Sequence, residues 1–234
     1  MTSPLMKINN LSFSIGEKHI INHITLSINP GDFVVILGGN GSGKSTLLKL
    51  INQTYRCTSG KIIFPENFKI VTLTQFITDS IFTDLTIEEN ALLIESASPQ
   101  PSFHKKTLLA ELPTYLSQFN PNLPKALKTR VNQLSGGEQQ ILAFALYLRH
   151  QPDLLLLDEH TSALDPKKAD GVMALTHEYL LKNRITCLMT THSLPYAVKY
   201  GNRLIALRDG QIVFEADTEQ KLILNSSDLL QHCY

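Results

Sequence analysis

Residues 38–46 read Gly-Gly-Asn-Gly-Ser-Gly-Lys-Ser-Thr. An apolar run over 33–37 precedes this stretch and apolar residues at helical spacing follow it over 47–51, which predicts a buried strand, a glycine loop and a helix. In that setting the glycines let successive backbone N–H groups turn toward a phosphate, and the helix adds its positive end. The sequence therefore predicts a phosphate-binding loop, in which Lys44 meets the β- and γ-phosphates of a nucleotide and the Ser45 hydroxyl holds Mg²⁺.

A second candidate site follows the four leucines at 154–157, where the chain continues with Asp158 and Glu159. An apolar strand that ends in two acids places both carboxylates at the carboxyl edge of a parallel sheet, where open α/β sheets bind ligands. A strand that merely ends in an Asp-Glu turn would show the same letters, and the phosphate loop upstream favours the functional interpretation. We therefore expect Asp158 to hold the magnesium shell and Glu159 to polarise an attacking water as general base.

A second glycine-containing helix start lies at 134–140, which reads Leu-Ser-Gly-Gly-Glu-Gln-Gln and precedes a helix predicted to run to about residue 150. Ser135 can cap that helix, and the two glycines expose backbone N–H groups at its positive end. The chain thus contains two predicted anion-binding helix termini. Two phosphate sites for one nucleotide favour a dimer in which each chain lends one.

Length and composition fit a single large α/β domain with an inserted subdomain, since the chain has 234 residues, a formal net charge of zero and a pI near 7.1. A balanced charge gives no global field toward nucleic acid or an anionic membrane. No apolar segment approaches the ~20 residues needed to cross a bilayer, and the N-terminus lacks a signal-peptide apolar region, so we expect the chain by itself to be soluble.

The order of patterns along the chain predicts its organisation. Alternating strands over 7–28 lead into the phosphate loop, helical patterns dominate from 78 to 145, and α/β patterns return after Pro152. Prolines, Pro113 among them, are expected to split the helical region into short helices, and Asp209-Gly210 predicts a two-residue hairpin turn. We expect one domain over 1–234: a P-loop core of mostly parallel sheet with an antiparallel β subdomain (1–75 and 146–234), and an inserted α-helical subdomain (76–145).

With these motifs in this order, the chain resembles the ATP-binding cassette (ABC) family over essentially its whole length. Residues 38–46, 134–140 and 154–159 match the family's Walker A, signature and Walker B motifs. The Q-loop glutamine matches Gln75, the D-loop matches Ser162-Ala163-Leu164-Asp165, and the switch histidine matches His192. A lone glutamine or histidine is usually an ordinary polar residue, but six motifs in register indicate the family.

The resemblance implies an ATPase that uses ATP and Mg²⁺ and closes as a head-to-tail homodimer around two nucleotides. It implies catalytic roles for Glu159, His192 and Gln75, metal contacts from Ser45, Gln75 and Asp158, and a link between the two sites through Asp165. The signature residues that would act on the partner's nucleotide are Ser135, Gly136, Gly137 and Glu138. The ATP-binding residues implied are Gly38, Gly39, Asn40, Gly41, Ser42, Gly43, Lys44, Ser45 and Thr46.

The implied function is to energise a membrane transporter, and a free-standing ATPase subunit favours import. The resemblance implies integral membrane permease subunits and an extracytoplasmic substrate-binding protein as partners, no nucleic acid, and a cytoplasmic location, peripheral on the inner face of the membrane. The segments 158–168 and 199–205 resemble a bacterial subgroup of such ATPases, some assigned to aromatic amino acids. The alternatives are a soluble ABC-type ATPase acting on nucleic acid or ribosomes, and another P-loop enzyme such as a kinase, against which the signature motif argues.

Four positions depart from the family pattern. Ile141 and Leu146 replace arginines that are common in the helix after the signature motif. His160 stands where a proline commonly follows the catalytic glutamate, and Ile15 stands where the family usually offers an aromatic ring to the adenine base. Strand alternation could turn Phe13 to the same face as Ile15, so either residue could lie against the base. The sequence therefore predicts loose adenine recognition.

Overall fold

The computed structural model describes residues 3–96, 105–224 and 229. Its contacts divide the chain into two compact units, which are described separately. The sheet unit comprises Met1–Thr72, Asp153–Glu159 and His177–Tyr234, and the helical unit comprises Leu73–Pro152 and His160–Thr176. Residues 97–104, expected in the helical insert, lie outside the described residues.

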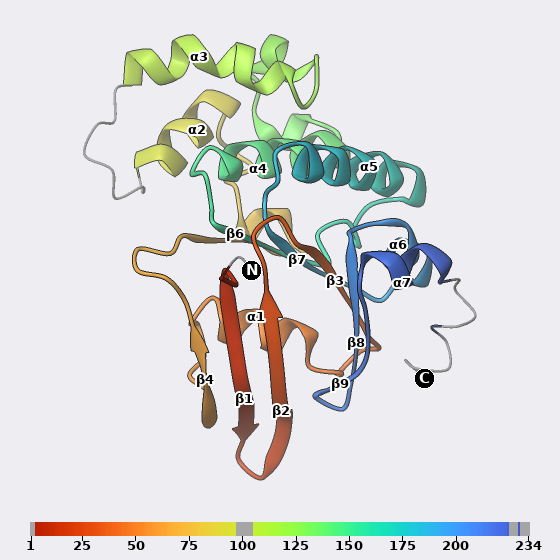
Figure 1. Ribbon diagram of the computed structural model, residues 1–234. Coiled ribbons are helices and arrows are strands. Elements are labelled where there is room, and N and C mark those ends of the chain that lie inside the picture. Colours follow the sequence, from red (N-terminus) through yellow and green to blue (C-terminus); the bar gives the residue numbers. More distant parts are fainter. Residues whose placement is uncertain (1–2, 97–104, 225–228, 230–234) are drawn as a thin grey trace. The chain divides into compact units, whose positions relative to one another are not determined.

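A six-stranded sheet carries the phosphate loop (Figure 1). Its order is β5-β6-β7-β3-β8-β9, and the parallel neighbours of β3 are β7 and β8. All five residues of β3 are buried, as expected for a central strand covered on both faces. The strands are β3 (Phe33–Leu37), β5 (Ile70–Leu73), β6 (Leu154–Asp158), β7 (Cys187–Thr191), β8 (Arg203–Arg208) and β9 (Gln211–Ala216).

A smaller antiparallel sheet in the same unit has the order β2-β1-β4. Its strands are β1 (Met6–Ile15), β2 (Lys18–Ile28) and β4 (Ser59–Ile63). Along β2, Ile24, Leu26 and Ile28 are buried while the residues between them are exposed, which is the alternation of a sheet with one face on a core. Together the two sheets confirm the predicted α/β fold with its antiparallel part.

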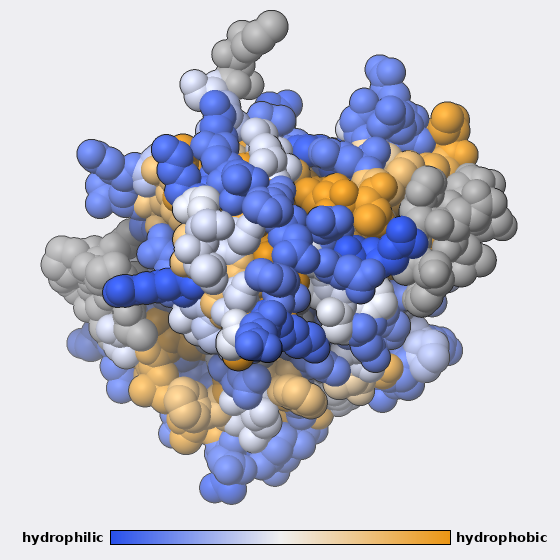
Figure 2. Space-filling view, turned by 90° about the horizontal axis from the view of Figure 1, so that it is seen from below, coloured by the Kyte–Doolittle hydropathy of each residue, from blue (hydrophilic) through white to orange (hydrophobic). Residues whose placement is uncertain are grey.

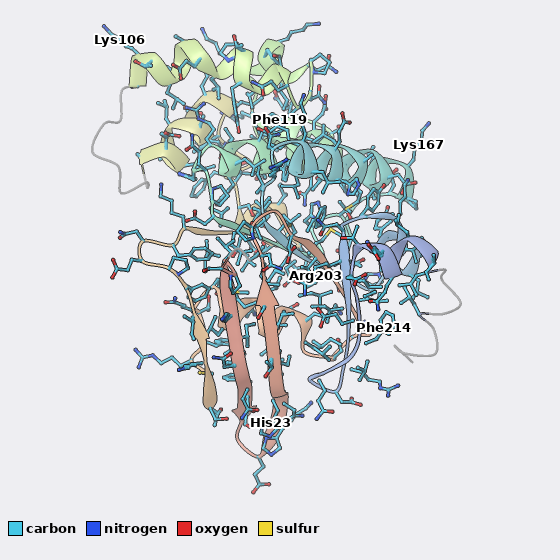
Figure 3. The ribbon with its side chains drawn as sticks, in the orientation of Figure 1. His23, Lys106, Phe119, Lys167, Arg203 and Phe214 are labelled. Carbon is cyan, nitrogen blue, oxygen red and sulfur yellow. The ribbon has the colours of Figure 1, made fainter. Side chains whose placement is uncertain are left out.

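Short helices complete the sheet unit: α1 (Lys44–Ile51), α6 (Leu194–Lys199) and α7 (Thr218–Ile223). The side chain of Arg203, labelled in Figure 3, forms ion pairs with Asp32 and Glu215. Lys221 of α7 is only 5% exposed and donates to the carbonyls of Tyr200 and Gly201 just beyond α6. Burial lowers the pKa of Lys221 to about 8.

The β8–β9 turn confirms the predicted hairpin, since Asp209 and Gly210 have φ of 49° and 75°. This turn contacts the phosphate loop. The Gly210 N–H donates to the Ser42 carbonyl at 3.1 Å, and a Cβ on Gly38 would lie 2.5 Å from the Leu207 carbonyl oxygen. The glycine at 38 therefore allows a close approach that any other residue would block.

The helical unit is built around buried leucines and aromatic rings. Phe119, labelled in Figure 3, packs its ring against those of Tyr115 and Phe144. Its α2 begins with a capping box, because the Thr86 and Glu89 side chains each accept from the other's backbone N–H. The elements are η1 (Ile77–Asp79), α2 (Ile87–Ser96), α3 (Lys105–Ser117), η2 (Leu123–Ala126), η3 (Val131–Gln133), α4 (Gly136–Leu148) and the start of α5 (Pro166–Lys182).

Two features of the helical unit differ from the sequence-based expectations. Pro113 lies inside α3 and does not end it, because the buried stripe of Leu108, Leu112 and Leu116 holds the helix together on both sides. In addition, residues 73–75, 146–152 and 160–176, assigned to the core from sequence, belong to the helical unit. The reason is packing: α4 continues unbroken to Leu148, and the first turns of α5 lie against its N-terminal glycines.

The surface seen in Figure 2 is largely hydrophilic, with apolar residues in small patches. In the part of the chain that the structure describes, no helix combines the length and apolar character required of a membrane span.

Candidate functional site

The phosphate loop ends in a helix whose N-terminus has no side-chain cap. The N-cap residue Gly43 has φ of 103° and no side chain to accept from the first turn of α1, so the helix's N–H groups point into the loop. Lys44 is 5% exposed, and its ammonium donates to the carbonyls of Gly38 at 2.9 Å and Gly39 at 3.0 Å. The loop is therefore a preformed cradle of amides around one positive charge.

Asp158 lies at the carboxyl end of β6, as the sequence predicts. Its Oδ1 accepts from the Ser45 hydroxyl at 3.0 Å and from the Thr190 hydroxyl at 2.6 Å. The parallel pairing of β6 with β7 sets Asp158 opposite Thr190, so strand register alone brings these two residues together. Three oxygen-bearing side chains thus meet beside the first turn of α1.

Glu159 lies between two positively charged or chargeable groups. Its Oε1 is 3.5 Å from the Lys44 ammonium, and its Oε2 is 3.1 Å from Nδ1 of His192. The Glu159 side chain is 17% exposed and that of His192 is 55% exposed, so this carboxylate faces an edge that water can reach. A carboxylate held here is placed to accept a proton from a water near a phosphate.

The chemistry of the donor set fits magnesium. Mg²⁺ prefers oxygen ligands and is usually held by one or two carboxylates together with the phosphates of its substrate. Ser45 and Asp158 supply a hydroxyl and a carboxylate within 3.0 Å of each other. Within the described residues, no group of three or more His, Cys, Asp and Glu side chains could by itself hold a metal ion. The arrangement suits a metal that arrives with a nucleotide.

The signature motif starts α4 in the helical unit. Ser135 caps the helix as predicted and forms a complete capping box with Glu138, whose Oε2 also accepts from the Ser135 hydroxyl at 2.7 Å. Gly136 lies close to the D-loop, since a Cβ there would approach Leu164 Cδ2 to 3.1 Å. A side chain at this position would require the Leu164 side chain to shift by a few tenths of an ångström.

Two further predicted residues, Asp165 and Gln75, also belong to the helical unit. Asp165 caps α5 by accepting from the Lys168 N–H at 3.1 Å, and this bond lowers the pKa of the Asp165 carboxyl. Gln75 is half-buried in the segment between β5 and η1.

The structure therefore brings together five of the predicted residues in the sheet unit: Lys44, Ser45, Asp158, Glu159 and His192. The signature residues and the D-loop meet in the helical unit. Sequence reasoning missed Thr190, which bonds Asp158 and also accepts from the Glu159 N–H at 3.1 Å. Its signal was a hydroxyl residue near the end of an apolar strand.

Comparison with known proteins gives the same picture. Residues 21–162 match the family described as "ABC transporter". The tyrosine transport ATP-binding protein of Clostridioides difficile (strain R20291) is 34% identical, over 97% of this chain and 98% of its own length. A phosphonates import ATP-binding protein, PhnC of Fusobacterium nucleatum, is 30% identical, over 90% of this chain and 91% of its own length.

Solved structures agree in fold. Cassette cbiO1 of Clostridium perfringens, part of the ABC transporter complex cbiONQ, has a TM-score of 0.81 at 22% identity and covers 93% of this chain and 90% of its own. The cassette MJ0796, in a dimeric post-hydrolysis state bound to ADP and phosphate, has a TM-score of 0.71 at 26% identity, covering 91% and 98%. With its phosphate loop, acidic strand end and signature helix, the chain belongs to the ABC transporter family and is one of its ATP-hydrolysing cassettes.

Proposed function

We propose that this cassette energises import through a membrane permease, by closing on ATP as a head-to-tail dimer and reopening after hydrolysis. The observation that carries the proposal is the convergence of Lys44, Ser45, Asp158, Glu159 and His192 at one sheet edge. Import is supported by the similarity to a tyrosine transport and a phosphonates import ATP-binding protein. The location that follows is the inner face of the cell membrane, with an extracytoplasmic binding protein delivering the substrate.

In the proposed mechanism the amides of the phosphate loop and Lys44 bind the β- and γ-phosphates. Lys44 neutralises charge that develops on the transferred phosphoryl group. Glu159 orients the attacking water and accepts its proton, and His192, 3.1 Å from Glu159, holds that carboxylate in position and contacts the γ-phosphate. Gln75, which matches the family's Q-loop glutamine, is proposed as a further catalytic residue.

Mg²⁺ is proposed as the cofactor, held by Ser45 and Asp158 with a contact from Gln75. Bound there, it would neutralise charge shared between the β- and γ-phosphates. The Thr190 hydroxyl, 2.6 Å from Asp158, would hold in one orientation the carboxylate that binds the ion.

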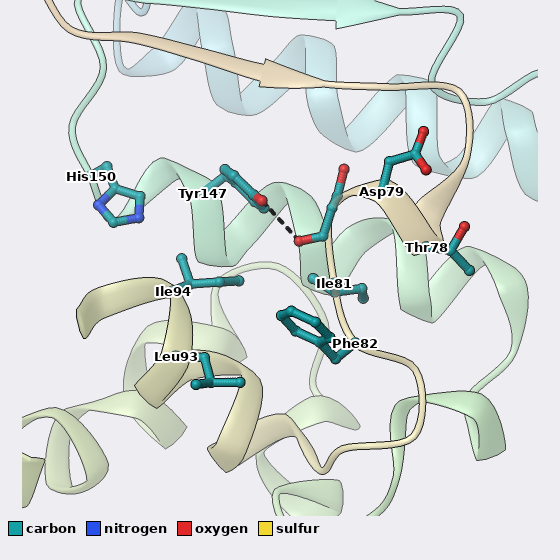
Figure 4. Close-up of a pocket in the computed structure, with 9 residues that line it drawn as sticks. Thr78, Asp79, Ile81, Phe82, Leu93, Ile94, Tyr147 and His150 are labelled. Atoms are coloured by element: carbon teal, nitrogen blue, oxygen red, sulfur yellow. Dashed lines mark hydrogen bonds between the residues drawn. The ribbon is translucent and has the colours of Figure 1, made fainter. Parts of the chain in front are cut away.

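The helical unit offers a groove for the permease, shown in Figure 4. It has a volume of about 430 Å³ and is lined by residues of η1, α2 and α4 and of the segments beside them, including Phe82, Leu93 and His150. Phe82 is 62% exposed and Leu93 is 43% exposed, although both are large apolar residues. The Tyr147 hydroxyl supports the groove by donating to the Ser80 carbonyl at 2.9 Å. We propose that a short permease helix docks here on these apolar side chains.

The catalytic assignment is tested with Glu159→Gln. We expect turnover to fall by about 10²–10⁴-fold, as for loss of a general base, while MgATP still binds and the protein accumulates as a closed dimer. Turnover is followed by phosphate release, and dimerisation by size-exclusion chromatography with ATP. A variant that stays monomeric with ATP and keeps wild-type turnover would remove Glu159 from the mechanism.

The partner is tested with Phe82→Glu. A charge in the groove should remove docking, so a permease that co-purifies with the wild-type chain from native membranes should be lost, while basal ATP hydrolysis by the isolated subunit stays within about 2-fold. Thr114→Glu, which adds the same charge to the exposed face of α3, is the control and should retain the permease. Retention of the permease by Phe82→Glu would exclude this groove, and equal loss of hydrolysis would indicate a folding defect.

A further inference from the structure

The backbone at Glu159 is held in an unusual conformation. Glu159 has φ of 46°, in the left-handed region that residues with a side chain rarely adopt. Such a conformation persists only where the surroundings fix it, and it is common at functional sites. The contacts that hold this backbone conformation therefore determine the direction of the Glu159 carboxylate.

Hydrogen bonds hold the backbone on both sides of Glu159. On its N-terminal side, the Glu159 N–H donates to the Thr190 hydroxyl at 3.1 Å. On its C-terminal side, the Gln140 side-chain amide donates to the carbonyl of His160, the next residue. Both Gln140, 7% exposed, and His160, 2% exposed, are buried, so water cannot replace this bond.

Gln140 lies on α4, the helix that begins with the signature motif. The helix is continuous from Gly136 to Leu148, and Gln140 lies five residues after the cap residue Ser135. An α-helix moves as a rigid rod over so short a distance, since each turn is bonded to the next. A displacement of the signature end is therefore transmitted to the His160 carbonyl through the Gln140 side chain.

We propose that Gln140 is a positioning residue that connects a chain's signature motif to its own general base. The proposal rests on the function proposed above, in which the signature motif engages the nucleotide of the partner chain. Contact with that nucleotide sets the position of α4. The bond from Gln140 then moves the His160 carbonyl with the helix, and the backbone at Glu159 takes its catalytic orientation. One chain thus activates its own hydrolysis when it has bound the other chain's ATP.

The test uses Gln140→Leu and Gln140→Met, which keep the volume of the buried side chain and remove the amide donor. We expect kcat to fall by about 10–100-fold, the size expected when a buried carbonyl loses its partner, with the KM for MgATP changed less than about 3-fold. Tyr115→Phe is the matched control: it removes a side-chain bond of 2.7 Å to a backbone carbonyl of the same helix, at Ala145, and should leave kcat unchanged.

A double-mutant cycle separates positioning from stability. If Gln140 acts through Glu159, Gln140→Leu should lower turnover in the wild-type background and change the residual turnover of Glu159→Gln less than about 2-fold. The proposal would be overturned by an equal loss of turnover in both backgrounds, or by a fall in kcat accompanied by a comparable rise in KM. Unchanged kcat in both Gln140 variants would also overturn it. A wild-type chain without ATP hydrolysis would instead contradict the proposed function itself, so the two failures are distinguishable.

Discussion

Two glycine-containing helix starts, at α1 and α4, look alike in sequence and differ in structure. The N-terminus of α1 has no side-chain cap and has Lys44 beside it, whereas the N-terminus of α4 is closed by the Ser135–Glu138 capping box. The first helix therefore presents free N–H groups and a positive charge to a ligand. The second has already satisfied part of its N–H groups and holds a carboxylate at its positive end.

The difference indicates that the two helix N-termini have different roles in phosphate binding. The loop at α1 can bind a polyphosphate by itself, because its amides and Lys44 are preorganised. The terminus of α4 cannot compete for an anion in free solution, because Glu138 occupies the favourable position and repels phosphate. In the proposed dimer it would act on a nucleotide that is already bound to the partner chain. A glycine-containing helix start alone therefore does not predict an independent anion site.

Removal of the positive charge of Lys44 should have the largest effect on the difference between the two helix starts. Lys44→Ala should weaken ATP binding by about 10–100-fold, since a hydrogen bond to a charged group contributes about 1.5–3 kcal/mol. Isothermal titration of ATP measures the loss. Lys49→Ala removes the same charge from the exposed last turn of the same helix and should bind ATP as the wild type does. Equal losses in both variants would mean that only net charge matters.

An aromatic ring introduced at position 15 tests whether the phosphate loop before α1 binds a nucleotide mainly through its phosphates. Ile15 is 61% exposed, while the Phe13 ring stacks on Tyr55 with centroids 5.4 Å apart, so Ile15 is the better placed for a base. Since stacking of a base on an aromatic contributes about 1–3 kcal/mol, Ile15→Tyr should tighten the binding of ATP and of GTP alike, by about 5–150-fold. Fluorescence titration with both nucleotides decides this. If tyrosine changes neither affinity, position 15 does not contact the base.

The capping carboxylate of α4 is the subject of the smallest predicted effect. Glu138→Gln keeps the capping box and removes its charge, so dimerisation of the Glu159→Gln form in ATP should tighten by about 2–5-fold, the range for one charge at a helix terminus. Analytical ultracentrifugation measures the dimer constant. Glu89→Gln makes the same change in the capping box of α2 and should leave dimerisation unaltered. Weaker dimerisation of Glu138→Gln would contradict the inhibitory role of the carboxylate.

Local chemistry made much of this structure predictable. The phosphate loop, the Ser135 cap and the Asp209-Gly210 turn each depend on residues close in sequence, and all three formed as expected. The left-handed turn at Glu159 could not be predicted in this way. It depends on two bonds between residues distant in sequence. Thr190 lies 31 residues after Glu159, and Gln140 lies 20 residues before its partner His160. For the same reason the prediction that Pro113 ends a helix was wrong. Tertiary packing overrides a local helix breaker, and Pro113 lies inside α3.

The contact between the β8–β9 turn and the phosphate loop has a consequence for how the protein is made. Gly210 bonds Ser42, and β3 is flanked by β7 and β8, both encoded long after it. A growing chain on the ribosome therefore carries the loop's sequence through most of its synthesis without the strands that hold it, and β3 stays unpaired meanwhile. We therefore expect nucleotide binding to arise only after residue 210 has been synthesised, too late to assist the earlier steps of folding.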